Sequence, residues 1–540
     1  MPRRVGILLL LLFVCGGSGA GAQSGTGTDV RAPAAPSLIV LITVDQLRDD
    51  YLDRFGPQLN AGLARLARGG AWFTNAHHDH AITETAPGHA TLLAGRFPRS
   101  TGIMANRIGV IDEAAPLIGV AGGPTIPGAA VITGASPRRF QGSTLVDWLH
   151  ARNSQSRTLS VSMKDRGAIL PVGRSRAEVY WYYPDGRFTT SSYYRASLPE
   201  WVERFNARRL PQSFAGKSWT PLLPDSAYKE PDSVSVEMNG VNFTFPHRMP
   251  DDSVSAASSL RVSPWMDEIT LALALDGLRA LTLGEPGRTD VLAISLSATD
   301  LIGHGYGPDS KEMHDNILRL DRSLGVFLDS LFKLRDSSRV AVALTADHGI
   351  GTIPELAASS VKPTPVRVDA AALAARLRSL AAAAGIDSGL VELDQQIVLA
   401  DPNLLETRGP GLDSVLAAFA LQVKALPGIA RVDRFQDLIR GDTINDAITR
   451  RWVHQFPAQA NVALVITLTP FSIFSGLVAT HGSPRDYDTH VPLIFWGAWF
   501  KPGRYSDFVR TVDLAATLAE IAGVNPGERI DGVVLRRALK

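Results

Sequence analysis

Residues 38–45 have the sequence LIVLITVD, an unbroken apolar run that ends in the carboxylate of Asp45. Two later stretches repeat this arrangement, VLAISLSATD at residues 291–300 and VAVALTADHG at residues 340–349. Apolar runs of this length are typical of strands that are buried on both faces of a parallel sheet. Open α/β sheets bind their ligands at the carboxyl ends of such strands, so we expect the polar ends of these three runs to meet.

The polar residues at the ends of these runs are suited to binding metal ions. A fourth strand-like apolar run, residues 491–496, begins directly after a histidine. Aspartate and histidine supply the oxygen and nitrogen ligands that zinc accepts, and six such residues would divide naturally over two ions. The candidate ligands are Asp45, Asp300, His304, Asp347, His348 and His490.

A separate stretch, residues 83–91, offers a nucleophile. Its sequence TETAPGHAT places Thr85 shortly before a proline and an apolar run, which is typical of a loop that enters a helix. The free N–H groups at a helix N-terminus favour an anion. Taken alone, Thr85 is more typical of a helix cap, and its hydroxyl needs a base or a metal to take its proton. We expect His89 to support this loop by hydrogen bonding.

The N-terminus has the features of a secretory signal peptide. Two arginines precede the apolar residues 5–14, and the small residues before position 23 form a cleavage site, so we expect removal of residues 1–22. The only cysteine, Cys15, lies inside this segment, and the bulky Val14 before it disfavours lipid modification. A location in the bacterial periplasm or outside the cell follows. No later stretch has 18 uninterrupted apolar residues, so no membrane span is expected after cleavage.

The charge balance disfavours nucleic-acid binding. The full chain of 540 residues has a formal net charge of +1, and loss of Arg3 and Arg4 with the signal peptide changes it to −1. A nearly neutral chain lacks the basic field on which nucleic-acid binders depend. We therefore expect a small-molecule substrate and no nucleic-acid partner.

The rest of the chain has the organisation of one large catalytic domain. After a flexible leader at residues 23–36, we expect this domain over residues 37–540, interrupted by inserted lobes at about 167–285 and 354–474. The first lobe is rich in aromatic residues and proline. Helices are predicted near residues 264–283 in the first lobe, and over 369–384 and near 412–425 in the second.

In order and local context, these motifs resemble the alkaline phosphatase superfamily, particularly its branch shared with nucleotide pyrophosphatase/phosphodiesterases. The resemblance covers roughly residues 37–166, 286–353 and 480–535. It implies an α/β fold with a mostly parallel central sheet and helices on both faces. It also implies two Zn²⁺ ions, one held by Asp300, His304 and His490. The other would be held by Asp45, Asp347 and His348, with the Thr85 oxygen completing its shell.

Three further residues resemble those of the phosphate-irrepressible alkaline phosphatase subgroup, in which they contact the phosphoryl oxygens: Asn106, Lys164 and Arg166. Two cations aimed at a phosphoryl group favour a monoester, because its dianion carries one more charge than a diester. The resemblance therefore implies hydrolysis of phosphate monoesters through a phosphothreonine on Thr85, with a weaker diesterase side reaction. The plain alternative is that Lys164 and Arg166 form a solvated turn with Asp165.

Other functions stay open at this point. The nearest is a nucleotide pyrophosphatase or phosphodiesterase with the same metals, and a non-catalytic periplasmic binding protein with this fold is more distant. A sulfatase is disfavoured, because Thr85 stands where a cysteine or serine is needed. The secretory signal disfavours a phosphomutase. His481 and His314 are expected at most to form hydrogen bonds to the metal ligands, without binding a metal themselves.

Overall fold

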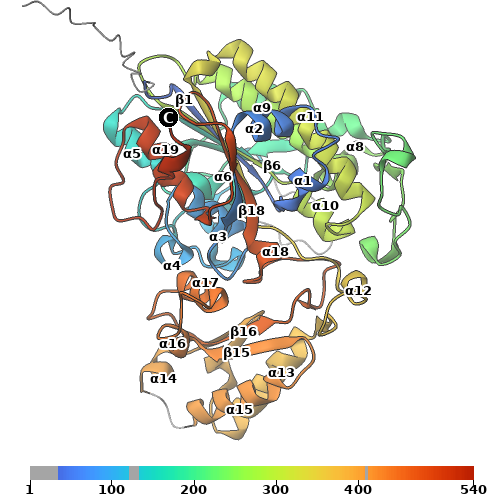
Figure 1. Ribbon diagram of the computed structural model, residues 1–540, viewed down its shortest axis with the longest axis vertical. Helices are drawn as coiled ribbons and strands as arrows, with labels where there is room; N and C mark the ends of the chain where they lie inside the picture. Colours follow the sequence, from blue (N-terminus) through green and yellow to red (C-terminus); the bar gives the residue numbers. More distant parts are fainter. Residues whose placement is uncertain (1–33, 121–132, 408–410) are drawn as a thin grey trace, which may run out of the picture. The chain divides into compact units, whose positions relative to one another are not determined.

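The computed structural model describes residues 34–120, 133–407 and 411–540 of the chain (Figure 1). The predicted signal peptide lies outside this part, as does the predicted leader except for its last three residues. Residues Ala34–Lys540 form one compact unit. Within the described part, no helix is both long and apolar enough to cross a bilayer.

A sheet of ten strands forms the centre of the protein, and its middle is parallel. The five parallel strands lie in the order β11 (Val340–Thr345), β1 (Leu38–Val44), β10 (Asp290–Leu296), β5 (Thr158–Ser162) and β6 (Glu178–Tyr183). Next to β11 lies β18 (His490–Trp496), which is antiparallel to both of its neighbours, β11 and β2 (Ala71–His77). The outer strands are β19 (Gly503–Tyr505), β20 (Val509–Arg510) and β7 (Arg187–Thr189). The predicted mostly parallel sheet is confirmed.

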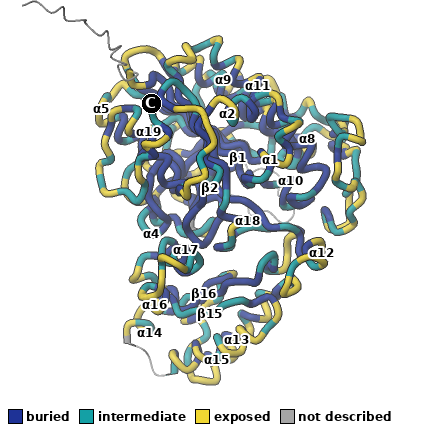
Figure 2. The backbone as a smooth tube through the Cα atoms, in the orientation of Figure 1, coloured by how far each residue is buried: buried dark blue, intermediate teal, exposed yellow. Residues whose placement is uncertain are grey.

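Each face of this sheet is covered by helices. Side chains alternate along β1, so Val40 and Ile42 join the hydrophobic cluster on one face while Ile39 and Leu41 join the cluster on the other. Helices on the first face are α2 (Gly62–Gly69), α9 (Trp265–Ala280) and α11 (Lys311–Leu334); those on the second are α3 (Thr85–Leu92), α5 (Leu145–Arg152), α6 (Asp165–Ile169) and α19 (Asp513–Ala522). Figure 2 shows that the central strands are buried. The apolar runs therefore become strands because both of their faces exclude water.

The two predicted insertions differ in how they relate to the sheet. In the first, β6 and β7 extend the central sheet, and Tyr180 and Tyr182 of β6 pack in its core, so this region is not a separate lobe over its whole length. The second has its own antiparallel sheet of β13 (Val391–Asp394), β14 (Ile397–Ala400), β16 (Val462–Leu468) and β15 (Ile429–Arg434). Helices α13 (Ala370–Ala383) and α15 (Leu412–Lys424) pack on this sheet and share its hydrophobic cluster.

Short elements complete the described chain. Two of them matter for the site, helix α10 (Ala298–Tyr306) after β10 and the 3₁₀ turn η1 (Asn106–Ile108). The other short α-helices and strands are α1 (Asp50–Arg54), α4 (Pro98–Thr101), α7 (Glu200–Ala207), α8 (Ser253–Ser259), α12 (Pro354–Ala357), α14 (Pro402–Thr407), α16 (Phe435–Leu438), α17 (Ala447–Gln455), α18 (Asp486–Thr489), β3 (Ile111–Pro116), β4 (Gly134–Ala135), β8 (Ser218–Trp219), β9 (His247–Arg248), β12 (Arg367–Val368) and β17 (Ile473–Phe474).

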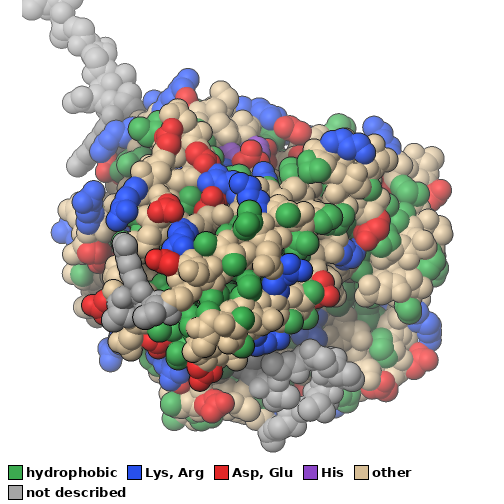
Figure 3. All heavy atoms as spheres, turned by 90° about the horizontal axis from the view of Figure 1, so that it is seen from below, with side chains coloured by type: hydrophobic (Ala, Val, Ile, Leu, Met, Phe, Trp, Pro, Cys, Tyr) green, Lys and Arg blue, Asp and Glu red, His purple; other side chains and the backbone are tan. Residues whose placement is uncertain are grey.

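Acidic and basic side chains are interspersed on the surface that Figure 3 shows, and neither sign dominates there. This distribution matches the formal net charge of +1 for the full chain. On that face, the protein surface therefore presents no extended field of one sign.

Candidate active site

Three aspartates meet at the carboxyl edge of the central sheet. Asp45 follows β1, Asp347 follows β11, and Asp300 lies in the first turn of α10 after β10. These strands are adjacent and parallel, and the backbone N–H of Asp45 donates to Leu296 O at 2.9 Å. The three residues are at most 2% exposed. Adjacent parallel strands thus bring together residues that are far apart in the sequence.

Two groups of side chains in this place have the geometry of metal sites. The ligand atoms of Asp300, His304 and His481 all lie within 4.8 Å of one another, and so do those of Asp45, Asp300 and His348. Asp347 adjoins the second group, with Oδ2 at 3.5 Å from His348 Nε2. The spacing of four residues puts Asp300 and His304 on one face of α10, where Nε2 lies 3.3 Å from Asp300 Oδ1.

The three histidines all present the same ring nitrogen to the carboxylates. Nδ1 of His304 donates to Ala479 O at 2.9 Å, Nδ1 of His348 to Gly349 O at 2.9 Å, and Nδ1 of His481 to Thr83 O at 2.7 Å. A backbone carbonyl only accepts, so each Nδ1 carries the hydrogen, and in the neutral ring Nε2 keeps a lone pair. His348 Nε2 and Asp45 Oδ1 are buried 3.5 Å apart, and neither has a hydrogen-bond partner among the described residues. This donor set fits divalent cations.

Buried negative charge exceeds buried positive charge at this edge. Lys164 Nζ lies 2.7 Å from Asp45 Oδ2 and 2.5 Å from Asp300 Oδ2, and it is the cation that touches both carboxylates in the described part of the chain. Burial and the nearby charges of Asp300 and Asp347 raise the pKa of Asp45 well above its ordinary value. Burial opposes the charged form of Lys164, but Asp300 and Asp45 outweigh it and raise the pKa of the ammonium. One lysine among three carboxylates leaves buried negative charge without a counter-charge, and divalent cations would neutralise it.

The prediction for His490 needs correction. Strand β18 is antiparallel to β11, so His490 lies at the correct edge of the sheet, but its side chain points toward β2. Its Nε2 donates to Thr74 O at 2.9 Å and lies 3.5 Å from Asp49 Oδ2, and its ring stacks on His77 at 4.6 Å. The loop before α18 instead brings His481 within 3.5 Å of Asp300. His481, and not His490, lies with Asp300 and His304.

Thr85 is the first residue of α3 and is almost completely buried. Its Oγ1 lies 3.3 Å from Lys164 Nζ. The ring of His89, one turn later, donates from Nδ1 to Thr85 O at 2.9 Å and bonds through Nε2 with Ser295 Oγ at 2.8 Å, so the expected support of the loop is present. A Cβ atom on Gly88 would lie 2.2 Å from Asp347 O, so only glycine lets α3 approach the Asp347 loop this closely.

Asn106 and Arg166 lie around the same helix N-terminus. Asn106 Oδ1 accepts a hydrogen bond from the backbone N–H of Ala86 at 2.8 Å, which leaves the side-chain NH₂ group to point elsewhere. Arg166 lies close enough to Glu84 and Lys164 to influence the charge of both. Its nearest carboxylate is Asp165 at 3.5 Å, and its side chain is 28% exposed. Among the residues predicted to contact a phosphoryl group, Lys164 is the one that contacts Thr85 Oγ1 in the described structure, at 3.3 Å.

Sequence reasoning underestimated one residue and missed another. His481 was expected only to support the metal ligands and not to be one itself. The sequence feature that could have identified it is its position next to Gly482, where the core resumes after the second insertion. Gln46 donates from Nε2 to Asp300 Oδ1 at 2.7 Å and from its backbone N to Asp347 Oδ1 at 3.1 Å. This bridging requires a positive φ of 68°. Its one sequence signal was its place directly after Asp45.

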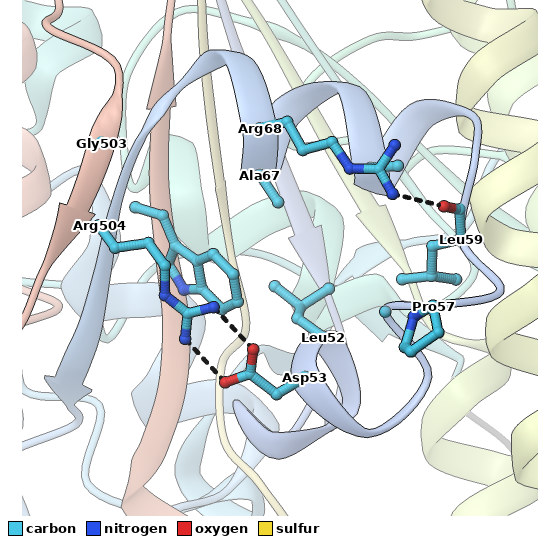
Figure 4. A pocket seen from close by; sticks show the side chains of 11 residues that line it. Leu52, Asp53, Pro57, Leu59, Ala67, Arg68, Gly503 and Arg504 are labelled. Carbon is cyan, nitrogen blue, oxygen red and sulfur yellow. Dashed lines mark hydrogen bonds and ion pairs between the residues drawn. The ribbon is translucent and has the colours of Figure 1, made fainter.

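A pocket of about 440 Å³ lies elsewhere, between α1, α2 and β19 (Figure 4). Its charged groups are already paired: Arg504 forms two ion-pair contacts with Asp53, at 2.7 and 2.8 Å, and its guanidinium lies 4.1 Å from the centre of the Trp72 ring. Arg68 donates to Leu59 O at 3.1 Å. None of the predicted site residues lines this pocket, so the sheet edge is the better candidate for catalysis.

Comparisons with known proteins show what this chain is similar to. A sequence profile of the type I phosphodiesterase / nucleotide pyrophosphatase family matches residues 39–367. The chain is 29% identical over 537 residues to the alkaline phosphatase PafA of Elizabethkingia meningoseptica, covering 95% of each protein. It is 30% identical over 529 residues to the alkaline phosphatase PhoK of a Sphingomonas species, covering 93% of this chain and 91% of that protein. The crystal structure of PafA superimposes with a TM-score of 0.84 at 27% identity, covering 94% of this chain and all of that one.

Proposed function

Because this chain belongs to the type I phosphodiesterase / nucleotide pyrophosphatase family and has full-length alkaline phosphatase relatives, we propose that this phosphoric ester hydrolase is a secreted, zinc-dependent alkaline phosphatase. Its substrates would be small phosphate monoesters. The observation that carries this proposal is the contact of the buried Lys164 ammonium with Thr85 Oγ1 at 3.3 Å, beside the two groups of metal-binding side chains.

Two divalent cations fit the donor set described above. Asp300, His304 and His481 would hold one, and Asp45, Asp347 and His348 the other, next to Thr85. When bound, two Zn²⁺ ions would lower the pKa of a coordinated hydroxyl and neutralise charge that develops on the phosphoryl oxygens.

Thr85 would then act as the nucleophile. Its Oγ1 forms a bond to phosphorus while the bond from phosphorus to the ester oxygen breaks, and the proton that the Thr85 hydroxyl loses passes through water to the departing alcohol. A second water hydrolyses the phosphothreonine, releases inorganic phosphate and restores the Thr85 hydroxyl. Lys164, Asn106 and Arg166 would hold the remaining phosphoryl oxygens through charge-assisted hydrogen bonds and orient phosphorus for the attack.

The three phosphoryl contacts favour a monoester. A monoester dianion exposes three oxygens to Lys164, Arg166 and Asn106, whereas a diester replaces one of these with a second alcohol and carries less charge. The test is the ratio of kcat/KM for p-nitrophenyl phosphate to that for bis-p-nitrophenyl phosphate. We expect the monoester to be preferred, and a strong preference for the diester would overturn the assignment.

A nucleotide pyrophosphatase or phosphodiesterase activity is the second candidate. The family profile that matches residues 39–367 is described by those activities, and the same metals and nucleophile would serve them. We place it second because a diesterase has less use for the charges of Lys164 and Arg166. The same two substrates distinguish the candidates.

Secretion is proposed from the signal-like sequence of residues 1–22. Release of phosphate from esters that do not cross membranes is useful outside the cytoplasm. N-terminal sequencing of the protein from a bacterial host tests this, with a mature chain that begins near Gln23 as the expected result. A cytoplasmic protein that keeps Met1 would contradict it.

A further inference from the structure

A pocket of about 130 Å³ is lined in part by Glu84, the residue before the proposed nucleophile. Three segments form it: the chain before α3, the turn η1, and the hairpin that joins β13 to β14 in the second insertion. The lining residues used below are Glu84, Asn106, Asp394, Gln395 and Gln396. Glu84 precedes Thr85 in the chain, and Asn106 Oδ1 accepts a hydrogen bond from the backbone N–H of Ala86, the residue after Thr85. Two lining residues therefore adjoin the proposed nucleophile.

The hairpin is tied to the catalytic edge on both sides. Arg107 Nε donates to Asp394 Oδ2 at 2.9 Å, and the side-chain amide of Gln396 donates to Gly482 O, directly after His481. The backbone carbonyl of Gln396 accepts from Ile466 N at 2.7 Å, which anchors the turn to the insertion's own sheet. The pocket wall is therefore held in place next to the group of Asp300, His304 and His481.

Gln395 stands at the tip of this hairpin with its side chain available. It is exposed, and in the described structure its side chain makes no hydrogen bond to another residue. Its φ of 51° lies in the left-handed region, which a residue other than glycine, asparagine or aspartate adopts infrequently. Such conformations persist mainly where the surroundings require them, often at functional sites. The turn thus presents Gln395 at the mouth of the pocket.

The chemistry of the lining favours hydroxyl groups. Carboxylates and amides on Glu84, Asn106, Asp394 and Gln395 offer both donors and acceptors, as hydroxyl groups require. The described residues that line the pocket include no aromatic ring on which a base or a phenyl group could stack. Arg107 also lines the pocket and pairs with Asp394, so the lining carries charges of both signs.

We propose that this pocket binds the alcohol portion of the substrate and selects phosphate esters of hydroxyl-rich alcohols, such as polyols and sugars, over aryl esters. This assignment rests on the proposed monoesterase function. A site that hydrogen-bonds a substrate hydroxyl rejects analogues without it, because its own polar groups are then left unpaired. Gln395 is the residue whose side chain is free to make such a contact.

The test compares Gln395→Gly with the wild-type enzyme on glycerol 2-phosphate, a hexose 6-phosphate and phenyl phosphate. Glycine accepts a positive φ, so this variant removes the side chain and keeps the turn. We expect kcat/KM to fall about tenfold for the two polyol esters and less than about twofold for phenyl phosphate, as for loss of about one hydrogen bond. The variant-to-wild-type ratio cancels the different leaving-group abilities of the alcohols.

Two controls make the result specific. Gln422→Ala changes another exposed glutamine of the same insertion, on α15, and should leave all three ratios unchanged. The inhibition constant of inorganic phosphate should also be the same in Gln395→Gly and wild type, since phosphate has no alcohol portion. Equal losses for all three esters, no loss for any of them, or weaker phosphate inhibition would each overturn the proposal. A wild-type enzyme that hydrolyses none of the monoesters would instead refute the proposed function, and the pocket assignment with it.

Discussion

The Nζ atom of Lys164 lies 3.3 Å from the Oγ1 atom of Thr85, although 79 positions separate the two residues in the chain. The same nitrogen contacts the carboxylate of Asp45, which follows β1, and that of Asp300 in the first turn of α10. A single buried cation therefore touches the proposed nucleophile and both proposed metal sites. Substitutions at these residues should therefore affect nucleophilic attack, phosphoryl recognition and metal binding separately.

Replacement of Thr85 by alanine should abolish turnover. Without Oγ1 no covalent intermediate forms, and we expect kcat/KM for p-nitrophenyl phosphate to fall by about 10³-fold or more. Thr85→Ser keeps a hydroxyl and should retain much of the activity. Acid quenching with ³²P-labelled substrate should trap label on wild type and not on Thr85→Ala. Label on the alanine variant would contradict the role of Thr85.

Loss of Lys164 should damage monoesterase activity more than diesterase activity. Removal of one charge-assisted donor to a transition state costs about 10²–10³-fold in rate. We expect that loss for p-nitrophenyl phosphate in Lys164→Ala and a much smaller one for bis-p-nitrophenyl phosphate. Lys333→Ala, an exposed lysine on α11, is the control and should change neither. Equal losses on both substrates would show that Lys164 does not recognise the additional charge.

Metal content should distinguish His481 from His490. Only His481 lies with Asp300 and His304, so His481→Ala should lower the metal content from about two ions per chain toward one. His490→Ala should keep both ions, because that ring bonds to Thr74 and stacks on His77. Elemental analysis of the two purified variants provides the measurement. The opposite pattern would restore His490 as a ligand.

Chelation should lower stability as well as activity. Removal of the metal leaves Asp45, Asp300 and Asp347 buried with Lys164 as their shared counter-charge, so the free energy of unfolding should decrease. A ligand present at 100 times its Kd contributes about 2.7 kcal/mol per site. We therefore expect a lower Tm after treatment with a chelator and recovery of Tm and activity on addition of Zn²⁺. An unchanged Tm would argue against metal at this edge.

The stability of the protein should depend on Glu237 at alkaline pH. Burial, followed by the charges of Glu312 and Asp232, raises the pKa of this carboxyl to about 9. His247 Nε2 lies 2.9 Å from Glu312 Oε1. A folded-state pKa above the unfolded value means that the folded protein binds the proton more tightly. The stability that the folded protein gains from keeping Glu237 protonated is complete below about pH 4.5 and is lost as the pH rises toward 9.

Glu237→Gln should remove this pH dependence. The amide stays neutral, so the variant should gain about 2 °C or more in Tm relative to wild type at pH 9 and nothing at pH 4.5. Glu203→Gln, which changes an exposed carboxyl on α7, serves as a comparison for loss of an acid. The same difference in Tm at both pH values would show that ionisation of Glu237 is not involved.

Some of the site followed from local sequence. Apolar runs that end in Asp45, in Asp300 and in Asp347 predicted three parallel strands with polar carboxyl ends, and the structure brings those ends together. A spacing of four residues placed Asp300 and His304 on one helical face. Both features can be predicted from the sequence. The periodicity of neighbouring residues identifies the strands and the helix, and ligands in open α/β sheets bind at the carboxyl ends of the strands.

The remaining features depended on contacts between distant segments. The run at residues 491–496 indicated a strand. Only the folded structure shows that the side chain of His490, the first residue of β18, lies toward β2. It also shows that the loop before α18 brings His481 close to Asp300. Likewise, only packing brought the Gln395 hairpin beside Asn106. Side-chain periodicity is local, whereas loop path and the face on which a terminal residue lies are set by long-range packing. The sequence by itself therefore determined which residue types stand at the edge of the sheet, and tertiary structure decided which of them meet.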